Sequence, residues 1–130
     1  MHKYILTLFI YISTVFHAFG LAVGTWQVYP SYANLTEISP AGDVCFALAS
    51  GSLFAYNNTT AETTVFNKTT GLAGIDISHI AWSQQAKRLV VAYGDGNIDL
   101  VSASGDITNV PGLYLSETVS DKTVSHIYID

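Results

Sequence analysis

One stretch of the chain returns 45 positions further on. Residues 47–56 and residues 92–101 each place a glycine between two apolar runs. A second echo follows, in which Ile77-Ser78-His79-Ile80 returns 47 positions later as Val124-Ser125-His126-Ile127. A strand-rich repeat of about 40–50 residues is the sequence signature of β-propeller blades. The repeat therefore predicts an all-β fold built from units that cannot bury their own faces alone.

The residues around the first copy predict four consecutive strands. Val, Ile, Thr, Tyr and Phe dominate short runs separated by Gly, Asn, Asp and Ser, and helical periodicity is absent. Short turns between successive runs are typical of an antiparallel meander. Within a first blade at about 34–67, the runs expected as strands are 35–38, 44–49, 53–56 and 63–66.

A second unit repeats this order at about 75–110. Its expected strands are 77–82, 89–93, 97–101 and 107–110. Asp95-Gly96 between apolar runs is a strong hairpin signal, because glycine accepts the positive φ that such a turn requires. A third unit is expected to open at about 122–130.

Two runs, 44–49 and 89–93, are apolar on both faces rather than alternating. Strands covered on both sides have this pattern, and the middle strands of a blade lie between neighbouring blades. Ring closure takes about four to eight blades. The sequence therefore predicts an incomplete β-propeller over 21–130, the N-terminal portion of a longer protein. Residues 26–29 are a candidate closure strand that would pair with the last blade.

The first twenty residues have the composition of a secretory signal peptide. A basic start at Lys3 precedes residues 4–16, which carry no charge, and Ala18-Phe19-Gly20 offers the small residues of a cleavage site. We expect a signal peptide over 1–20 and therefore export. The alternative is an uncleaved anchor over 4–23, a stretch nearly long enough to span a bilayer.

The charge balance and the missing motifs narrow the function classes. Five basic residues stand against ten acidic ones, for a net charge of −5, so no basic stripe is available for nucleic acid. The sequence has neither a Gly-x-Ser-x-Gly nucleophile motif nor a Gly-rich phosphate loop, and we expect no cofactor. Cys45 is the only cysteine and is expected to be a small buried thiol.

Four stretches stand out beyond the repeat, at 24–26, 51–56, 67–72 and 89–101. They resemble the N-terminal propeller of the PorZ family, which belongs to the type IX secretion system of Bacteroidetes. The resemblance implies an exported, non-enzymatic scaffold or recognition module in the periplasm or at the cell surface and outer membrane. It would assist type IX secretion and the surface attachment of cargo proteins. The implied partners are other secretion-system or sortase-complex proteins, with lipopolysaccharide or another glycan as a ligand.

Two Ser-His pairs are the candidate ligand residues. Ser78 with His79 and Ser125 with His126 occupy equivalent places in strands that open a blade, and such strands line the channel of a propeller. They would present imidazoles and hydroxyls to a ligand, or they would pack the blades as ordinary structural residues. The packing interpretation is preferred. Two histidines without a third ligand do not make a zinc site, and no metal is expected.

The run that begins at Asp95 has some features of a calcium loop. Asn97 and Asp99 follow at alternate positions, and Asp106 falls at the twelfth place. A calcium loop needs glycine at its sixth place, where this chain has Leu100. At the twelfth place it needs a glutamate that binds calcium through both oxygens, and the side chain of Asp106 is too short for this. A turn followed by a half-polar strand is the preferred interpretation.

Two other function classes remain open. One is the periplasmic propeller of a hybrid two-component regulator that senses oligosaccharides, which the reading frame downstream of Asp130 would distinguish. The other is a propeller-type polysaccharide lyase or glycosidase. That enzyme would need carboxylates, tyrosines or histidines that converge on the channel mouth, and only His79 and His126 fit this description.

Overall fold

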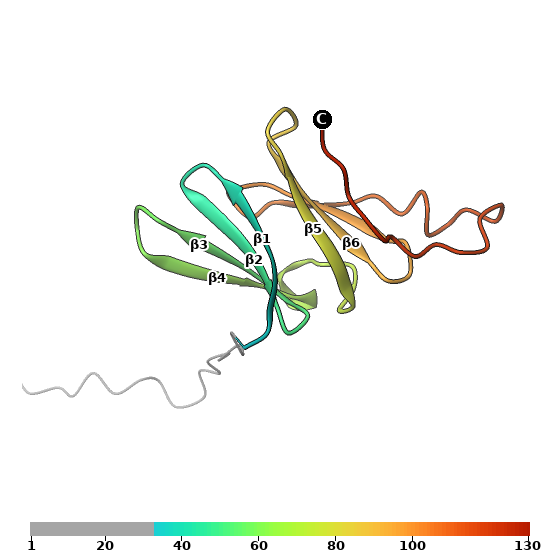
Figure 1. Ribbon diagram of the computed structural model, residues 1–130, viewed down its shortest axis with the longest axis horizontal. Coiled ribbons are helices and arrows are strands. Elements are labelled where there is room, and N and C mark those ends of the chain that lie inside the picture. Colours follow the sequence, from blue (N-terminus) through green and yellow to red (C-terminus); the bar gives the residue numbers. More distant parts are fainter. Residues whose placement is uncertain (1–32) are drawn as a thin grey trace, which may run out of the picture.

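The computed structural model describes residues 33–130, which fold into two four-stranded antiparallel sheets (Figure 1). In each sheet the strand order follows the sequence, so each is a simple meander. This confirms the all-β, partial-propeller prediction. The first blade contains β1 (Leu35–Ala41), β2 (Val44–Ala49), β3 (Ser52–Asn57) and β4 (Glu62–Phe66), and the second contains β5 (Ile77–Ser83), β6 (Arg88–Tyr93), β7 (Ile98–Val101) and β8 (Ile107–Asn109).

Two predicted segments lie outside the described residues: the signal peptide at 1–20 and the candidate closure strand at 26–29. Within residues 33–130, no helix has the length and apolar character needed to cross a membrane. The one helical element described there is a single 3-10 turn, η1 (Lys68–Thr70), in the connection between the blades.

The glycines of the repeated hairpin stand where the turns need them. Gly51 lies between β2 and β3 with φ +74°, and Gly96 lies between β6 and β7 with φ +83°. Residues that carry a side chain rarely adopt this left-handed backbone conformation. Glycine adopts it freely and therefore favours both turns. The first strand is longer than predicted, because β1 continues through Pro40 to Ala41. Proline is tolerated there because β1 has a strand neighbour on one side only.

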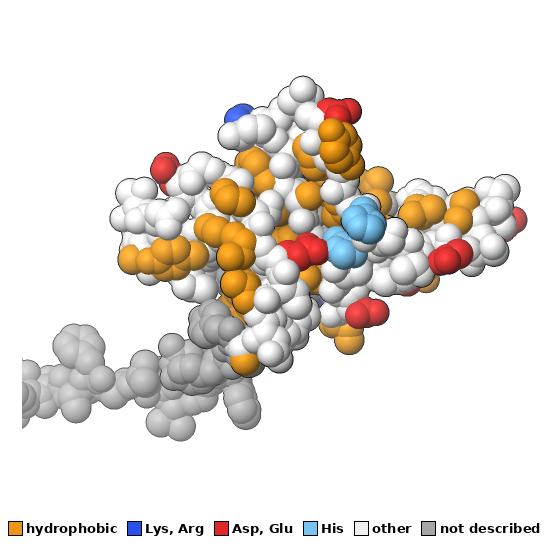
Figure 2. Space-filling view, in the orientation of Figure 1, with side chains coloured by type: hydrophobic (Ala, Val, Ile, Leu, Met, Phe, Trp, Pro, Cys, Tyr) orange, Lys and Arg blue, Asp and Glu red, His pale blue; other side chains and the backbone are white. Residues whose placement is uncertain are grey.

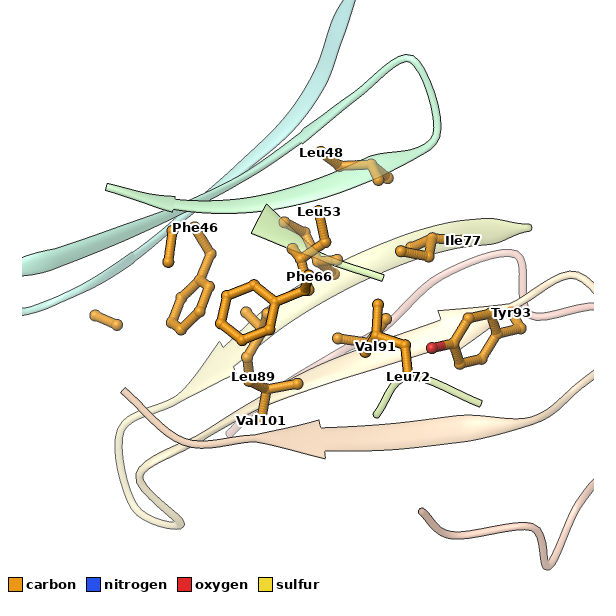
Figure 3. Close-up of a cluster of buried hydrophobic side chains, with 13 residues drawn as sticks. Phe46, Leu48, Leu53, Phe66, Leu72, Ile77, Leu89, Val91, Tyr93 and Val101 are labelled. Atoms are coloured by element: carbon orange, nitrogen blue, oxygen red, sulfur yellow. The ribbon is translucent and has the colours of Figure 1, made fainter. Parts of the chain in front are cut away.

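The core lies between the two sheets (Figure 3). Phe46 and Leu53 from the first blade meet Leu89, Val91 and Val101 from the second, and all five are fully buried. The ring of Trp82 on β5 stacks on that of Phe46 on β2, with centroids 5.8 Å apart and an interplanar angle of 23°. Apolar burial between sheets is what stabilises a pair of blades.

The opposite face of the first blade is less covered. Residues that alternate with Phe46 and Leu48, among them Cys45 and Ala47, line a cavity of about 300 Å³. Cys45 is half-buried rather than buried, which corrects the sequence-based expectation. The reason is that its side chain points away from the second blade, the only neighbouring blade among the described residues.

The segment predicted to open a third blade, residues 122–130, contains no strand. In each of the two blades the first strand pairs with the second, β1 with β2 and β5 with β6. Residues 33–130 supply no second strand for the segment at 122–130, so it has no pairing partner there. It nevertheless lies beside the second blade, where His126 contacts His79 of β5. The third blade stays a prediction.

Candidate functional site at the first strands of the blades

The first strands of the two blades share a local irregularity. The register with the neighbouring strand shifts between Leu35 and Glu37 in β1, and between Ile77 and His79 in β5. Each shift is a β-bulge that leaves one extra residue without a partner on the next strand.

The extra residue of each bulge has a hydroxyl that bonds to the neighbouring strand. Thr36 Oγ1 donates to the carbonyl of Leu48, and Ser78 Oγ donates to the carbonyl of Ala92, both at 3.1 Å. The hydroxyl of Ser78 therefore stabilises its own blade. Ser125, the counterpart at the third repeat, is exposed and makes no hydrogen bond within residues 33–130.

The residue after each bulge contacts the next repeat: Glu37 contacts His79 of β5, and the His79 ring stacks with that of His126. Glu37 Oε1 lies 2.5 Å from His79 Nδ1, and Glu37 Oε2 accepts a hydrogen bond of 2.6 Å from the main-chain N–H of Ile80. The side chains of Glu37 and His79 are 28% and 31% exposed, so solvent still reaches both. An ionised carboxylate can only accept a hydrogen bond, so the contact with Glu37 favours the tautomer in which His79 Nδ1 is the N–H donor.

His126 extends this arrangement. Its ring lies nearly parallel to that of His79, with centroids 6.3 Å apart and an interplanar angle of 10°. Figure 2 shows the two imidazoles together on one face of the molecule, with an acidic side chain against them. We call Glu37, His79 and His126 the polar row. Each of its members comes from the same place in the repeat.

A second contact joins β1 to β5. Ser39 Oγ accepts a hydrogen bond of 2.7 Å from the main-chain N–H of Trp82. Ser39 is buried, with 7% of its surface exposed. The spacing of two residues between Glu37 and Ser39 matches the spacing between Ile80 and Trp82. Side chains of β1 therefore satisfy alternate main-chain donors of β5.

The structure brings together two of the four predicted site residues. His79 and His126 lie in contact, whereas Ser78 turns to its own blade and Ser125 is exposed. Glu37 is the member that sequence reasoning missed. A signal was present, because residues 35–38 and 77–80 share the order apolar, hydroxyl, polar, isoleucine.

In the run that resembles a calcium loop, the carboxylates of Asp99 and Asp106 accept hydrogen bonds from other groups of the protein. Asp99 is fully buried, and its Oδ2 accepts from the Tyr93 hydroxyl at 2.5 Å and from the Ala73 N–H at 2.8 Å. Its Oδ1 accepts from Asn109 Nδ2 at 2.8 Å. Burial, together with the hydrogen bond to Asp99, raises the pKa of Tyr93 far above its ordinary value.

Asp106 belongs to a separate network. Its Oδ2 accepts from the hydroxyls of Ser104 and Ser102, at 2.7 and 3.1 Å, and these two bonds lower the pKa of Asp106. No group of three or more His, Cys, Asp or Glu side chains within residues 33–130 is placed to hold a metal ion.

A cleft of about 480 Å³ lies among the loops of both blades. The loop between β5 and β6 contributes Gln84 and Lys87, whose Nζ donates to Gln84 Oε1 at 3.0 Å. Trp82 and Arg88 line the same cleft, and Trp82 Nε1 donates to Gln84 Oε1 at 2.9 Å. An aromatic ring beside cationic and amide groups is a combination that suits polar ligands.

Comparison with known proteins shows the family to which the chain belongs. The family described as the N-terminal β-propeller domain of PorZ, of the type IX secretion system, matches residues 45–130. The solved structure of PorZ from Porphyromonas gingivalis, an essential bacterial surface component of that system, is 31% identical with a TM-score of 0.71. The match covers 82% of this chain and 14% of the PorZ chain, so this chain spans about one seventh of that protein.

A second solved structure shares the fold. It is the extracellular domain of BT4673 of B. thetaiotaomicron, described as a putative one component system, which is 20% identical with a TM-score of 0.54. That match covers 73% of this chain and 12% of the other. No protein of curated function matches the chain. With two thirds of its residues matched by the family and 31% of its aligned positions identical to PorZ, the chain belongs to the PorZ N-terminal β-propeller family.

Proposed function

We propose that this chain is part of an exported, non-enzymatic scaffold or recognition module that assists type IX secretion. The observation that carries the proposal is the family match over residues 45–130, together with the likeness to PorZ, a bacterial surface component of that system. Its partners are other secretion-system or sortase-complex proteins at the outer membrane. Its location is the periplasm or the cell surface, and its role is the attachment of cargo proteins there.

The polar row lacks the pair of carboxylates that the glycosidase alternative requires. A glycosidase needs two carboxylates that flank the scissile bond. Both oxygens of Glu37 already accept hydrogen bonds, from His79 and from the Ile80 N–H. Asp99 and Asp106 each belong to a separate hydrogen-bond network elsewhere in the second blade.

Deletion of the gene in the bacterium that encodes this chain tests the secretory role. We expect cargo proteins of the type IX system to be lost from the cell surface, as measured by surface labelling and quantitative mass spectrometry. A plasmid copy of the intact gene should restore them. Unchanged surface cargo would contradict the proposal, and a defect confined to the response to oligosaccharides would favour the sensor alternative.

The glycan partner is also a proposal, and the cleft with Trp82 and Lys87 is where we place it. Lys87 is exposed and adds positive charge to an acidic chain, which suits the phosphate groups of lipopolysaccharide. Binding of purified lipopolysaccharide from the same bacterium should weaken about threefold in the Lys87→Ser variant. Lys68→Ser removes an exposed lysine outside the cleft and is the matched control. Equal effects of both substitutions would place the ligand elsewhere.

A further inference from the structure

The cleft of about 480 Å³ between the blades has two walls of different character. The loop between β5 and β6 contributes Gln84 and Lys87, and we call this side the donor wall. The loop between β7 and β8 contributes Ser102 and Ser104, and we call that side the acceptor wall. The volume of the cleft lies within the range of about 300–1,000 Å³ that is usual for small-molecule sites.

Gln84 gives the donor wall its orientation. Its Oε1 accepts from Trp82 Nε1 at 2.9 Å and from Lys87 Nζ at 3.0 Å. Because both of these neighbours can only donate, the amide oxygen of Gln84 faces them and the amide nitrogen faces away. Neither N–H of that nitrogen has a hydrogen-bond partner within residues 33–130. Both are therefore free to donate to a ligand.

Lys87 supplies the positive charge of the donor wall. It is exposed and makes no ion pair within residues 33–130, and Gln84 uses one of the three N–H donors of its ammonium. The guanidinium of Arg88 is already engaged, because its Nη1 donates to the main-chain carbonyl of Lys87 at 3.1 Å. A planar carboxylate is held best by a free arginine fork, whereas a lysine binds phosphate as a point charge. The donor wall therefore favours phosphate over carboxylate.

The acceptor wall has a negative charge behind its hydroxyls. Asp106 Oδ2 accepts from Ser104 Oγ at 2.7 Å and from Ser102 Oγ at 3.1 Å. These bonds, and after them the charge of Arg88, lower the pKa of Asp106, so this carboxylate is ionised at neutral pH. Because the proton of Ser104 is donated to Asp106, its oxygen is left to accept. Such a wall suits the hydroxyl groups of a sugar rather than an anion.

The backbone of Lys87 is strained. Its φ is +52°, and it is the only charged residue among the four non-glycine residues of 33–130 that have a positive φ. Glycine would adopt this conformation without strain. Backbone strain of this kind collects at functional sites, where the side chain is needed in spite of its cost. The turn between β5 and β6 therefore carries a lysine at a position where glycine would stabilise the fold.

We propose that the cleft is a subsite for a phosphorylated sugar. Lys87 Nζ and Gln84 Nε2 bind the phosphate oxygens, and Ser104 Oγ accepts a hydrogen bond from a sugar hydroxyl. The assignment of a sugar rests on the proposed glycan partner. Its phosphate is then the group that decides which glycans bind, whether that phosphate is attached to the polysaccharide or to the lipid.

Isothermal titration of the full chain with small probes tests the subsite. Glucose 6-phosphate should bind about tenfold more tightly than glucuronate, which carries a carboxylate in place of the phosphate ester. It should also bind about tenfold more tightly than inorganic phosphate, which has no sugar hydroxyl for Ser104. Equal binding of glucuronate would overturn the preference for phosphate, and equal binding of inorganic phosphate would overturn the sugar.

Two variants of Lys87 separate its charge from its strain. Lys87→Gly removes both, so binding of glucose 6-phosphate should weaken about tenfold while the Tm rises. Lys87→Gln removes the charge alone, so binding should weaken equally and the Tm should not change. Lys68→Gly on η1 is the control, which should keep binding and lower the Tm, because glycine is costly in a helical turn. Unchanged binding in Lys87→Gly, or a Tm that does not rise, would overturn the proposal.

Purified lipopolysaccharide separates the subsite from the proposed partner. Removal of its phosphates with hydrofluoric acid should weaken binding about threefold. Mild acid splits the polysaccharide from the lipid, and the part that competes with glucose 6-phosphate carries the phosphate that binds. Intact and dephosphorylated lipopolysaccharide that bind equally would overturn the subsite and leave the glycan partner standing. If lipopolysaccharide does not bind at all, that partner is contradicted, and the titration with glucose 6-phosphate still decides the subsite.

Discussion

Ser39 and Trp82 join the two blades through a hydrogen bond of 2.7 Å, in which the serine hydroxyl accepts from the tryptophan main chain. Glu37 makes the equivalent bond to the N–H of Ile80 at 2.6 Å. Both donors belong to β5, an edge strand whose one strand neighbour is β6. Main-chain donors at a partly buried edge need acceptors, and side chains of β1 supply them.

Replacement of Ser39 by alanine should leave the Trp82 N–H without its acceptor. A donor left unsatisfied in a buried place costs about 1–3 kcal/mol, so the free energy of unfolding should fall by about that amount. Urea denaturation measures it. Ser120→Ala is the matched control, because Ser120 is exposed and makes no hydrogen bond within residues 33–130. Equal stability of the two variants would argue against the bond.

Glu37 and His79 should be energetically coupled. Glu37→Gln keeps an oxygen acceptor for Ile80 but removes the charge, whereas Glu37→Ala removes both. The alanine variant should therefore lose more stability, about 1–2 kcal/mol against less than 1 kcal/mol for glutamine. A double-mutant cycle with His79→Gln should give a coupling energy of about 0.5–1 kcal/mol. Additive effects would show that the contact contributes nothing.

The hydroxyl of Tyr93 should make stability depend on alkaline pH. Its pKa is raised in the folded state, chiefly by burial and then by the hydrogen bond to Asp99. The folded protein therefore keeps a proton that the unfolded chain loses above about pH 10, the ordinary value for tyrosine. The free energy of unfolding should fall as pH rises above 10, by up to about 1.4 kcal/mol per pH unit.

Tyr93→Phe tests the source of that dependence. The variant should lose about 1.5–3 kcal/mol at neutral pH, because the buried Asp99 loses a donor. Its further loss between pH 9 and pH 11 should be smaller than that of the wild type, as measured by urea denaturation at each pH. The same alkaline loss in both proteins would assign it to other groups.

Gly74 should resist substitution because of the Tyr93 ring. A Cβ atom at this position would lie 2.6 Å from Tyr93 Cδ1, closer than atoms pack. Gly74→Ala should therefore lower the free energy of unfolding by about 1–3 kcal/mol, the usual cost of overpacking a core. At Gly112 a Cβ atom would meet nothing within 4 Å, so Gly112→Ala is the control. Thermal unfolding that shifts equally in both variants would contradict this packing.

The hairpins of both blades could be predicted from the sequence because their signals are local. Apolar runs such as 44–49 and 89–93, with Gly51 and Gly96 in the turns, specify antiparallel pairs between neighbours in sequence. The extension of β1 through Pro40 could not be predicted in this way. Proline usually marks the end of a strand, and it is tolerated within one only at the edge of a sheet, a position that the sequence does not reveal.

The joint between the blades was predicted only in part. The equivalence of His79 and His126 followed from identical residue types 47 positions apart, and the two rings do meet. Glu37 differs from histidine in residue type, so identical residues could not reveal it, and only the shared order of residue classes at 35–38 and 77–80 points to it. The contact of Ser39 with Trp82 spans 43 positions and depends on how the two sheets pack, which no local pattern specifies.

Amide hydrogen exchange at Ile80 and Trp82 tests the central claim, that side chains of the first blade hold the first strand of the second. In the wild-type chain both amides should be protected from exchange. Glu37→Ala should remove protection at Ile80, and Ser39→Ala should remove it at Trp82, each leaving the β6 amides protected. Fast exchange at Ile80 and Trp82 in the wild type, beside protected β6 amides, would contradict the account.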